Sequence, residues 1–413
     1  MLLTVLKLVA GAGVTVVVVP VFFCLSFGFQ YARSVLPPGI DQPFKLRFFH
    51  CIFLTVFLWG TVLEKLRLYK FLSLLRIVTD GIPPFGKDPA LLIQNQKFDG
   101  VTVRTYQPKA ESAVKRKGFL FFHGGAGTYG SVDCYERILR HISREADAVV
   151  VAVEYGLGPE HAYPNQYVEC EKATVHFMKH VADYNVDASR IVVSGDSCGA
   201  NFATRICQLL VSRSDLPRIH SQVLIYPGLQ GMDFYLPSYQ QNSKVPILWR
   251  ETVIYFCCLY LNKCTSVIDD VLESRHVPES VLKKYRKWVS ADLIPEEFKA
   301  RGYRPQDTGL YEFKPKVYEE MKAVLEENFS PLFAPDETIA KLPQTYILTC
   351  EFDVLRDDGL LYKRRLEDNG VPVKWVHVEN GFHGVAILFG YGLLSFPSAE
   401  RIVRETTDYI KGL

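Results

Sequence analysis

The sequence predicts an α/β fold in which helices cover both faces of a doubly wound, mostly parallel sheet. From residue 99 onwards, short apolar runs of strand length alternate with longer runs of helical periodicity, as in successive strand–helix–strand units. The expected strands are 99–105, 118–122, 148–153, 190–194, 221–226, 344–350 and 372–378, and the expected helices are 133–146, 166–183, 199–213, 357–369 and 396–412.

Residues 231–330 interrupt this alternation. They hold no regular strand pattern, but they contain polar helical stretches rich in Tyr, Trp and Pro. An insertion of this length exceeds an ordinary loop, so we expect a helical cap over the carboxyl edge of the sheet. The core of the sheet is then divided into residues 99–230 and 331–413. Helical periodicity over 64–92 predicts N-terminal cap helices within residues 33–98.

Charge and cysteine content exclude two classes of function. The chain carries 47 Lys and Arg against 45 Asp and Glu, a formal charge of +2, so it has no basic field that would recruit nucleic acid. The ten cysteines include no C-x-x-C pair and no zinc-site spacing, so no metal is expected. Their even number is compatible with one or two disulfides but identifies no pair.

The first apolar run, residues 8–29, predicts a membrane anchor within residues 1–32. It has no charged side chain over 22 positions, which is enough to cross a hydrocarbon core of roughly 30 Å. A cleaved signal peptide is the alternative. The run exceeds the usual ~7–15 apolar residues of such a peptide, however, and no clear cleavage site follows it.

A second apolar run at residues 48–63 is shorter and contains His50. It is compatible with a second crossing, a hairpin partner of the first run or an interfacial helix. Lys7 precedes the first run, whereas Arg33, Lys45 and Arg47 follow it. Because cytoplasmic flanks usually carry the basic excess, this distribution argues against a luminal C-terminus.

The segment Gly195–Gly199 (GDSCG) predicts a nucleophilic serine. It follows an apolar, β-branched strand and opens a helical run, and G-x-S-x-G in that context forms a sharp strand-to-helix turn. Small residues two before and two after Ser197 permit this turn. The turn holds the Ser197 hydroxyl at the helix N-terminus, above the sheet. A thiol nucleophile at Cys198 is disfavoured because the side chain after the serine points elsewhere.

A glycine-rich turn, His123–Gly127 (HGGAG), directly follows the strand GFLFF. Backbone N–H groups in such a turn can stabilise the oxyanion of an acyl-transfer reaction. We expect the donors to be the N–H groups of Gly124, Gly125 and Cys198, with His123 shaping the loop. A phosphate-binding loop is the alternative, but the turn lacks the Lys-Ser/Thr pair and the G-x-G-x-x-G spacing.

Acid and base are expected at the ends of the last two strands. Asp353 follows the strand 344–350, and His383 follows the strand 372–378. Both therefore reach the same sheet edge as Ser197, in the order that this fold requires. His383 would take the serine proton and Asp353 would orient the imidazole. A histidine beside glycines is otherwise an ordinary turn residue, and Asp357 and Asp358 are explained by capping of the next helix.

Taken together, these segments resemble a known family. HGGAG, YGLGPEHAYP, GDSCGAN, QVLIYPGLQ, DVLRDDG and NGFHG are similar to the hormone-sensitive-lipase branch of the α/β hydrolases, and within it to the arylacetamide deacetylase-like family. The resemblance implies an α/β-hydrolase fold and hydrolysis of lipophilic carboxylic esters or acyl amides without a cofactor. It also implies Ser197, Asp353 and His383 as the triad and Gly124 and Gly125 as oxyanion glycines.

The resemblance further implies a single-pass type II membrane protein whose catalytic domain lies in the endoplasmic reticulum lumen. The sequon at Asn328 agrees, since N-glycosylation requires a luminal site. The resemblance outweighs the charge argument made above. Three departures from the family pattern are Ala126 for glycine, Cys198 with Ala200 after the serine, and Gly156 after Tyr155. They predict altered substrate preference or weak activity.

Two classes of function remain open. The first is a hydrolase whose partners are a lipophilic ester or amide substrate and the lipid bilayer. The second is a hydrolase-fold membrane protein that binds ligands with little or no turnover. An intact triad and oxyanion loop favour the first, because binding alone needs neither. An acyltransferase or peptidase using the same serine is a further possibility, decided by pocket shape and access of water.

Overall fold

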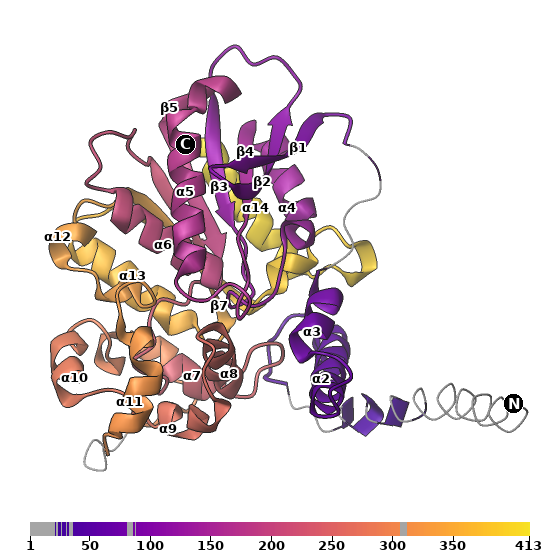
Figure 1. The fold of residues 1–413 in the computed structure, drawn as a ribbon, viewed down its shortest axis with the longest axis vertical. Helices are drawn as coiled ribbons and strands as arrows, with labels where there is room; N and C mark the ends of the chain where they lie inside the picture. Colours follow the sequence, from indigo (N-terminus) through magenta and orange to yellow (C-terminus); the bar gives the residue numbers. More distant parts are fainter. Residues whose placement is uncertain are drawn as a thin grey trace, which may run out of the picture.

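The structure is a computed structural model. It describes residues 36–413 except 81–85, 87 and 306–311, together with residues 21, 24, 25, 27–29, 31 and 32 of the N-terminal segment. Most of the predicted anchor at residues 8–29 lies outside the described residues. The described part places one sheet between helical layers, with a helical cap at one end and two N-terminal helices beside that cap (Figure 1).

Eight strands form one sheet in the order β1-β2-β4-β3-β5-β6-β7-β8. The first two pairings, β1 with β2 and β2 with β4, are antiparallel, and all the others are parallel. The predicted doubly wound, mostly parallel sheet is therefore confirmed. The strands are β1 Leu91–Phe98, β2 Val101–Pro108, β3 Arg116–Phe122, β4 Ala148–Glu154, β5 Val186–Asp196, β6 Ser221–Ile225, β7 Gln344–Phe352 and β8 Val373–Phe382.

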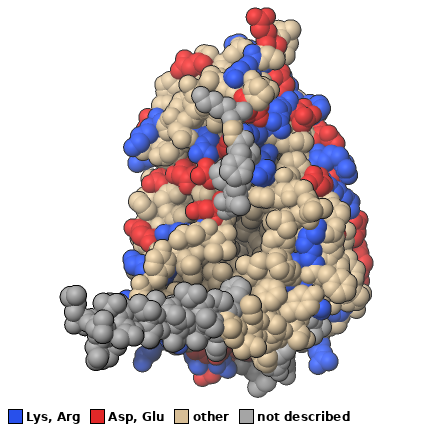
Figure 2. Space-filling view, turned by 90° about the vertical axis from the view of Figure 1, so that its right-hand side faces the viewer, with Lys and Arg blue, Asp and Glu red and all other residues tan. Residues whose placement is uncertain are grey.

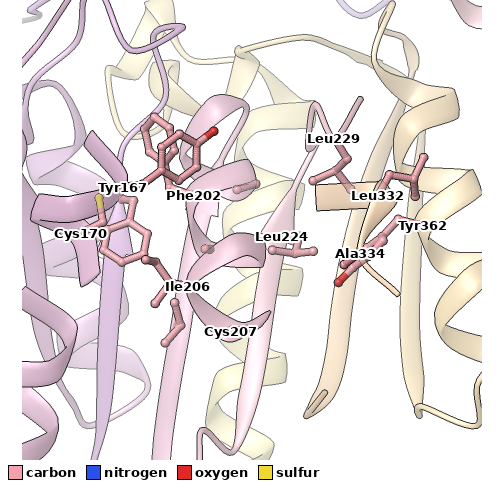
Figure 3. Close-up of a cluster of buried hydrophobic side chains, with 14 of the residues drawn as sticks. Tyr167, Cys170, Phe202, Ile206, Cys207, Leu224, Leu229, Leu332, Ala334 and Tyr362 are labelled. Carbon is pink, nitrogen blue, oxygen red and sulfur yellow. The ribbon is translucent and has the colours of Figure 1, made fainter. Parts of the chain in front are cut away.

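Helices cover the two faces because central strands are apolar on both sides. In β3, Phe119 and Phe121 join one buried cluster while Leu120 and Phe122 join the other, as alternation along a strand requires. The five predicted core helices are present: α4 Val132–Glu145 and α14 Pro397–Gly412 on the first face, and α5 Asn165–Lys179, α6 Cys198–Leu210 and α13 Arg356–Asp368 on the second. Figure 3 shows part of the second cluster, around side chains of α5 and α6.

The described residues between β6 and β7 contain helices and turns but no strand, in agreement with the predicted cap. The fully buried Arg356 of α13 ties this cap to the core. Its guanidinium pairs with Asp357 and Glu351 and donates to Gln241 and to the Phe298 carbonyl. The helices of this segment are α7 Pro237–Gln241, α8 Arg250–Tyr260, α9 Ile268–Leu272, α10 Glu279–Tyr285, α11 Pro315–Met321 and α12 Asp336–Ile339.

The N-terminal region differs in part from the sequence prediction. Helices α2 Pro43–Lys65 and α3 Phe71–Thr79 pair with each other. Of the predicted helical stretch 64–92, residues 66–70 connect these two helices, and residues 91 and 92 begin the edge strand β1 Leu91–Phe98. The core sheet therefore begins before residue 99. Strand β1 was missed because the middle of its sequence, LLIQNQKF, is a polar run (QNQK) and half of its residues are exposed. An edge strand that pairs on one side only needs no continuous apolar pattern.

The turn between β5 and α6 depends on glycine at position 199. A Cβ there would lie 2.0 Å from the Phe122 carbonyl oxygen and 2.5 Å from that of His123. We expect Gly199→Ala to lower the free energy of unfolding by about 3 kcal/mol or more, because backbone atoms at a strand end cannot move aside. Denaturant unfolding measures the loss. Gly412→Ala is the matched control, since its added Cβ meets nothing within 4 Å. Equal stability of the two variants would contradict the close contact.

Candidate active site

Ser197 lies at the tip of the turn between β5 and α6. Its backbone has φ 54° and ψ −123°, a region that non-glycine residues rarely adopt and that costs about 1–3 kcal/mol. The Ser197 N–H donates to the Ile225 carbonyl of the neighbouring strand β6, at 2.9 Å. The turn thus holds the serine above the sheet, as the G-x-S-x-G spacing predicts.

The structure brings the three predicted triad side chains together. His383 Nε2 lies 2.9 Å from Ser197 Oγ, and His383 Nδ1 lies 2.7 Å from Asp353 Oδ2. Asp353 is completely buried, and its other oxygen accepts a hydrogen bond from the Leu355 N–H. With the Nδ1 proton assigned from these partners, the imidazole can accept the serine proton at Nε2.

Asp357 and Asp358 hold the cap and do not extend the triad. Asp357 accepts from the Ser238 N–H, and Asp358 accepts from the N–H groups of Leu229 and Gln230. Both lie in the first turn of α13. Their carboxylates nevertheless accept from backbone N–H groups of the segment that follows β6, and not from N–H groups of their own helix. The capping role predicted from the sequence is therefore wrong. Burial raises the pKa of Asp358 to about 7.

In the loop 123–127, the structure disagrees with one predicted oxyanion donor, the Gly124 N–H. The Gly124 N–H donates to Asp196 Oδ1 at 2.7 Å and lies 3.2 Å from the Tyr135 hydroxyl, so it points away from the pocket. Within the described residues, no protein oxygen accepts from the N–H of Gly125 or Cys198. Consecutive glycines permit several peptide orientations. The sequence alone could not decide which N–H would face a substrate.

Asp196 is a buried anchor for this loop that sequence reasoning missed. Besides the Gly124 N–H, it accepts hydrogen bonds from the hydroxyls of Tyr135 and Tyr226. Burial raises the pKa of Asp196 to about 6. The available signal was an acid directly before the serine, at a strand end that must be buried.

His123 shapes the loop and is not placed to titrate. Its Nδ1 lies 2.7 Å from the Gly124 carbonyl oxygen, and its ring stacks on Tyr155 with centroids 4.2 Å apart. The Tyr155 hydroxyl donates to the His123 carbonyl at 2.6 Å. Burial lowers the pKa of His123 to about 4, so the ring is neutral at physiological pH.

A cavity of about 780 Å³, including space open to solvent at its mouth, contains Ser197 and His383. Its walls are mainly apolar and aromatic, and helix α8 of the cap contributes Val253, Phe256, Cys257 and Tyr260. The remaining lining residues are Ala126, Tyr129, Tyr167, Cys198, Asn201, Phe202, Gly228, Gln230, Phe234, Tyr239, Leu248, Phe329, Leu355 and Asp358. Such a pocket suits an apolar ligand.

The surroundings of Cys198 and Asn328 limit the ionisation of the thiol and the exposure of the amide. Cys198 Sγ accepts from the Gly127 N–H, and burial raises the pKa of its thiol to about 12, so no thiolate forms near neutral pH. All ten cysteines are free thiols. Asn328 is half-buried, and its side-chain oxygen accepts from Arg205, while Ser330 of the same sequon is completely buried.

With this geometry in hand, comparison with known proteins decides the family. The sequence family described as "alpha/beta hydrolase fold" matches residues 119–285 and 301–387. Human arylacetamide deacetylase-like 4 is 42% identical over 404 residues, covering 97% of this chain and 98% of the relative. The chain belongs to the arylacetamide deacetylase-like family of α/β hydrolases.

Two further similarities agree with this family. Mouse neutral cholesterol ester hydrolase 1 is 33% identical over 409 residues, covering 94% of this chain and 96% of the relative. Among solved structures, a mutant of the esterase rPPE complexed with (S)-Ac-CPA has a TM-score of 0.63 at 22% identity. It covers 91% of this chain and 98% of that one, a likeness of fold alone. This member of the arylacetamide deacetylase-like family is thus an esterase- and deacetylase-like α/β hydrolase.

The raised pKa of Asp196 gives a stability test of the loop anchor. The folded state keeps the Asp196 proton over a pH range in which the unfolded chain has lost it. As pH rises from about 4 to about 6, the wild type should therefore lose about 3 kcal/mol of unfolding free energy relative to Asp196→Asn, with no further change above this range. Denaturant unfolding at several pH values measures the difference.

Asp215→Asn is the control for this measurement. Asp215 is exposed, and its hydrogen bond from Arg213 lowers its pKa to about 2. The stability that this residue contributes is present above its unfolded pKa and is lost only as the pH falls towards about 2. Its variant should therefore track the wild type over the same range. A constant difference between wild type and Asp196→Asn would contradict a buried, ionisable anchor.

Proposed function

We propose that this protein is a serine carboxylic ester hydrolase acting on lipophilic esters or acyl amides, with Ser197 as nucleophile. The observation that carries the proposal is the continuous hydrogen-bond chain from Ser197 Oγ through His383 to Asp353 at the wall of an apolar pocket. A hydroxyl in this arrangement becomes nucleophilic only as its proton passes to the imidazole.

The reaction then follows from the positions of these groups. His383 takes the proton of Ser197 as the oxygen attacks the acyl carbon, and Asp353 stabilises the imidazolium that forms. The N–H groups of Gly125 and Cys198, beside the pocket-lining Ala126, receive the oxyanion, each donor contributing about 3–4 kcal/mol. His383 returns the proton to the leaving alcohol or amine, and water repeats the sequence on the acyl-enzyme.

The substrate class is inferred from the lining of the pocket. Its aromatic and aliphatic walls desolvate an apolar acyl or alcohol group, and the Tyr260 hydroxyl, without a partner in the described residues, offers one hydrogen bond. The names of two relatives, bovine arylacetamide deacetylase and mouse neutral cholesterol ester hydrolase 1, support the same class. Ala126 and Cys198 depart from the family pattern but keep their backbone N–H groups. These two departures therefore affect substrate preference and do not remove an oxyanion donor.

We place the protein in the membrane of the endoplasmic reticulum as a type II protein, anchored through residues 8–29 with the catalytic domain in the lumen. The uncharged length of that run supports the anchor. Family membership supports the orientation, and Asn328 is the candidate glycosylation site. A weakly active or inactive binding protein is the alternative, and it predicts little or no turnover.

Kinetics and active-site labelling test the proposal. Wild type in membranes should react with a fluorophosphonate probe and hydrolyse 4-nitrophenyl esters, whereas Ser197→Ala should do neither. Asp353→Asn should lower kcat by about 10⁴-fold, because the imidazole loses its orientation and its counter-charge. The matched control is Ser189→Ala, an exposed serine on β5 outside the pocket. Folded wild type that neither labels nor turns over would favour the binding protein.

A further inference from the structure

Exposed apolar side chains are concentrated in the N-terminal part of the chain. Of the large hydrophobic residues that the described structure leaves exposed, twelve lie between residues 21 and 78 and six in all the rest. The twelve are Val21, Leu25, Phe29, Phe44, Phe48, Leu58, Val62, Leu66, Leu68, Tyr69, Ile77 and Val78. Single exposed hydrophobics are ordinary, but a cluster of this size marks an interaction surface.

Helix α2 has the length and apolar composition that crossing a bilayer requires, alone among the described helices. It is nevertheless held against the catalytic domain from its start as far as Phe57, whose ring packs on Trp249 and Tyr255. Just before it, Asp41 accepts from the Ser398 N–H, and within it Lys45 Nζ donates to the Ser395 carbonyl at 2.7 Å. Further along, the His50 and Phe53 rings contact Trp249 of the cap. A crossing would break all these contacts, so α2 lies beside a membrane and not through it.

The connection between α2 and α3 has the composition of a membrane interface. Lys65, the last residue of α2, and the five residues 66–70 of the connection (together KLRLYK) are all exposed. Leucine and tyrosine side chains alternate there with three basic ones, a pattern that inserts apolar groups among headgroups while cations meet lipid phosphates. A protein partner or a second copy of this chain would not require basic side chains between the apolar ones.

Helices α2 and α3 with their connection, here called the α2–α3 hairpin, are also continuous with the predicted anchor. Phe27, near the end of the uncharged run, packs on Phe48 of α2 with ring centroids 5.6 Å apart. Figure 2 faces the side on which α2 and α3 lie in Figure 1, and a broad area of its lower half carries no Lys, Arg, Asp or Glu. A bilayer that receives residues 8–29 therefore already lies next to this surface.

Helix α3 connects the same surface to the active site. Arg76 donates to the carbonyls of Thr128 and Gly158, each at 2.8 Å, beside the loop 123–127. Phe71, Leu72 and Leu75 form a buried cluster with Phe256, against which Ala126 and Tyr129 pack. Phe256, Ala126 and Tyr129 line the catalytic pocket. The surface of α2 and α3 is thus separated from the catalytic pocket by one layer of side chains.

From these observations we propose that the α2–α3 hairpin is a second membrane-docking surface. It lies in the headgroup layer of a bilayer containing anionic phospholipids, with Leu66, Leu68 and Tyr69 inserted. The docking holds the catalytic pocket against the leaflet from which apolar substrates enter. The docking itself is independent of catalysis, whereas its consequence for substrate delivery rests on the function proposed above.

Depth of insertion tests the docking without using activity. In a full-length Cys24→Ser/Cys264→Ser background, which removes the two exposed cysteines, bimane is attached to Leu68→Cys or to the control Val114→Cys. Val114 is 64% exposed and precedes the amino end of β3, whereas the loop 123–127 and Ser197 follow the carboxyl ends of β3 and β5. In phosphatidylcholine–phosphatidylserine vesicles carrying nitroxide lipids, bimane should be quenched strongly at position 68 and little at 114. Equal, weak quenching at both positions, as when a second copy covers the hairpin, would overturn the proposal.

Substrate delivery is tested with a double variant. Leu66→Asp/Leu68→Asp should lower hydrolysis of a long-chain ester dissolved in vesicles by about tenfold or more, because two apolar anchors leave the interface. Hydrolysis of a water-soluble short ester should stay at the wild-type rate, which excludes misfolding, and Val114→Asp should change neither rate. Equal loss on both esters, or on neither, would overturn the delivery role. If wild type hydrolyses no ester, the proposed function fails, while the quenching result still decides the docking.

Discussion

The close approach of helix α6 to the end of strand β3 positions most of the site. Gly199 lies against the carbonyl oxygens of Phe122 and His123, where no Cβ fits. This contact places the first turn of α6 beside the loop that follows β3. In the proposed mechanism, the Cys198 N–H and the Gly125 N–H face one substrate oxygen, next to Ser197. The turn between β5 and α6 contains the strained backbone of Ser197, whose N–H donates to the Ile225 carbonyl of β6.

Buried carboxylates stabilise the groups around this contact. Asp196 fixes the loop 123–127 through the Gly124 N–H, and its two tyrosine donors tie it to α4 and to the end of β6. At the other end of the site, Arg356 with Asp357 and Asp358 joins α13 to the cap. Asp353 lies three residues before Arg356, at the start of the segment that makes these contacts. The cap also contacts Asp353 directly, because Asn242 of the cap donates to the Asp353 carbonyl at 2.9 Å.

The sequence predicted the parts of the molecule that obey strong local rules. Alternation of apolar runs identified seven of the eight strands, and the strand–turn–helix context of Ser197, with Asp353 and His383 in order behind it, identified three side chains that meet within hydrogen-bond distance. The failures have a common cause. The direction of the Gly124 N–H, the partners of Asp357 and Asp358, and the edge pairing of β1 are all set by tertiary contacts that no residue pattern encodes.

The most direct test of the account is a crystal structure of the protein after reaction with a phosphonate ester. The account predicts a bond from phosphorus to Ser197 Oγ. It also predicts a phosphoryl oxygen about 2.7–3.1 Å from the N–H nitrogens of Gly125 and Cys198, with the Gly124 N–H still on Asp196. An unmodified Ser197, or a phosphoryl oxygen directed away from the loop 123–127, would contradict a functional triad and oxyanion site.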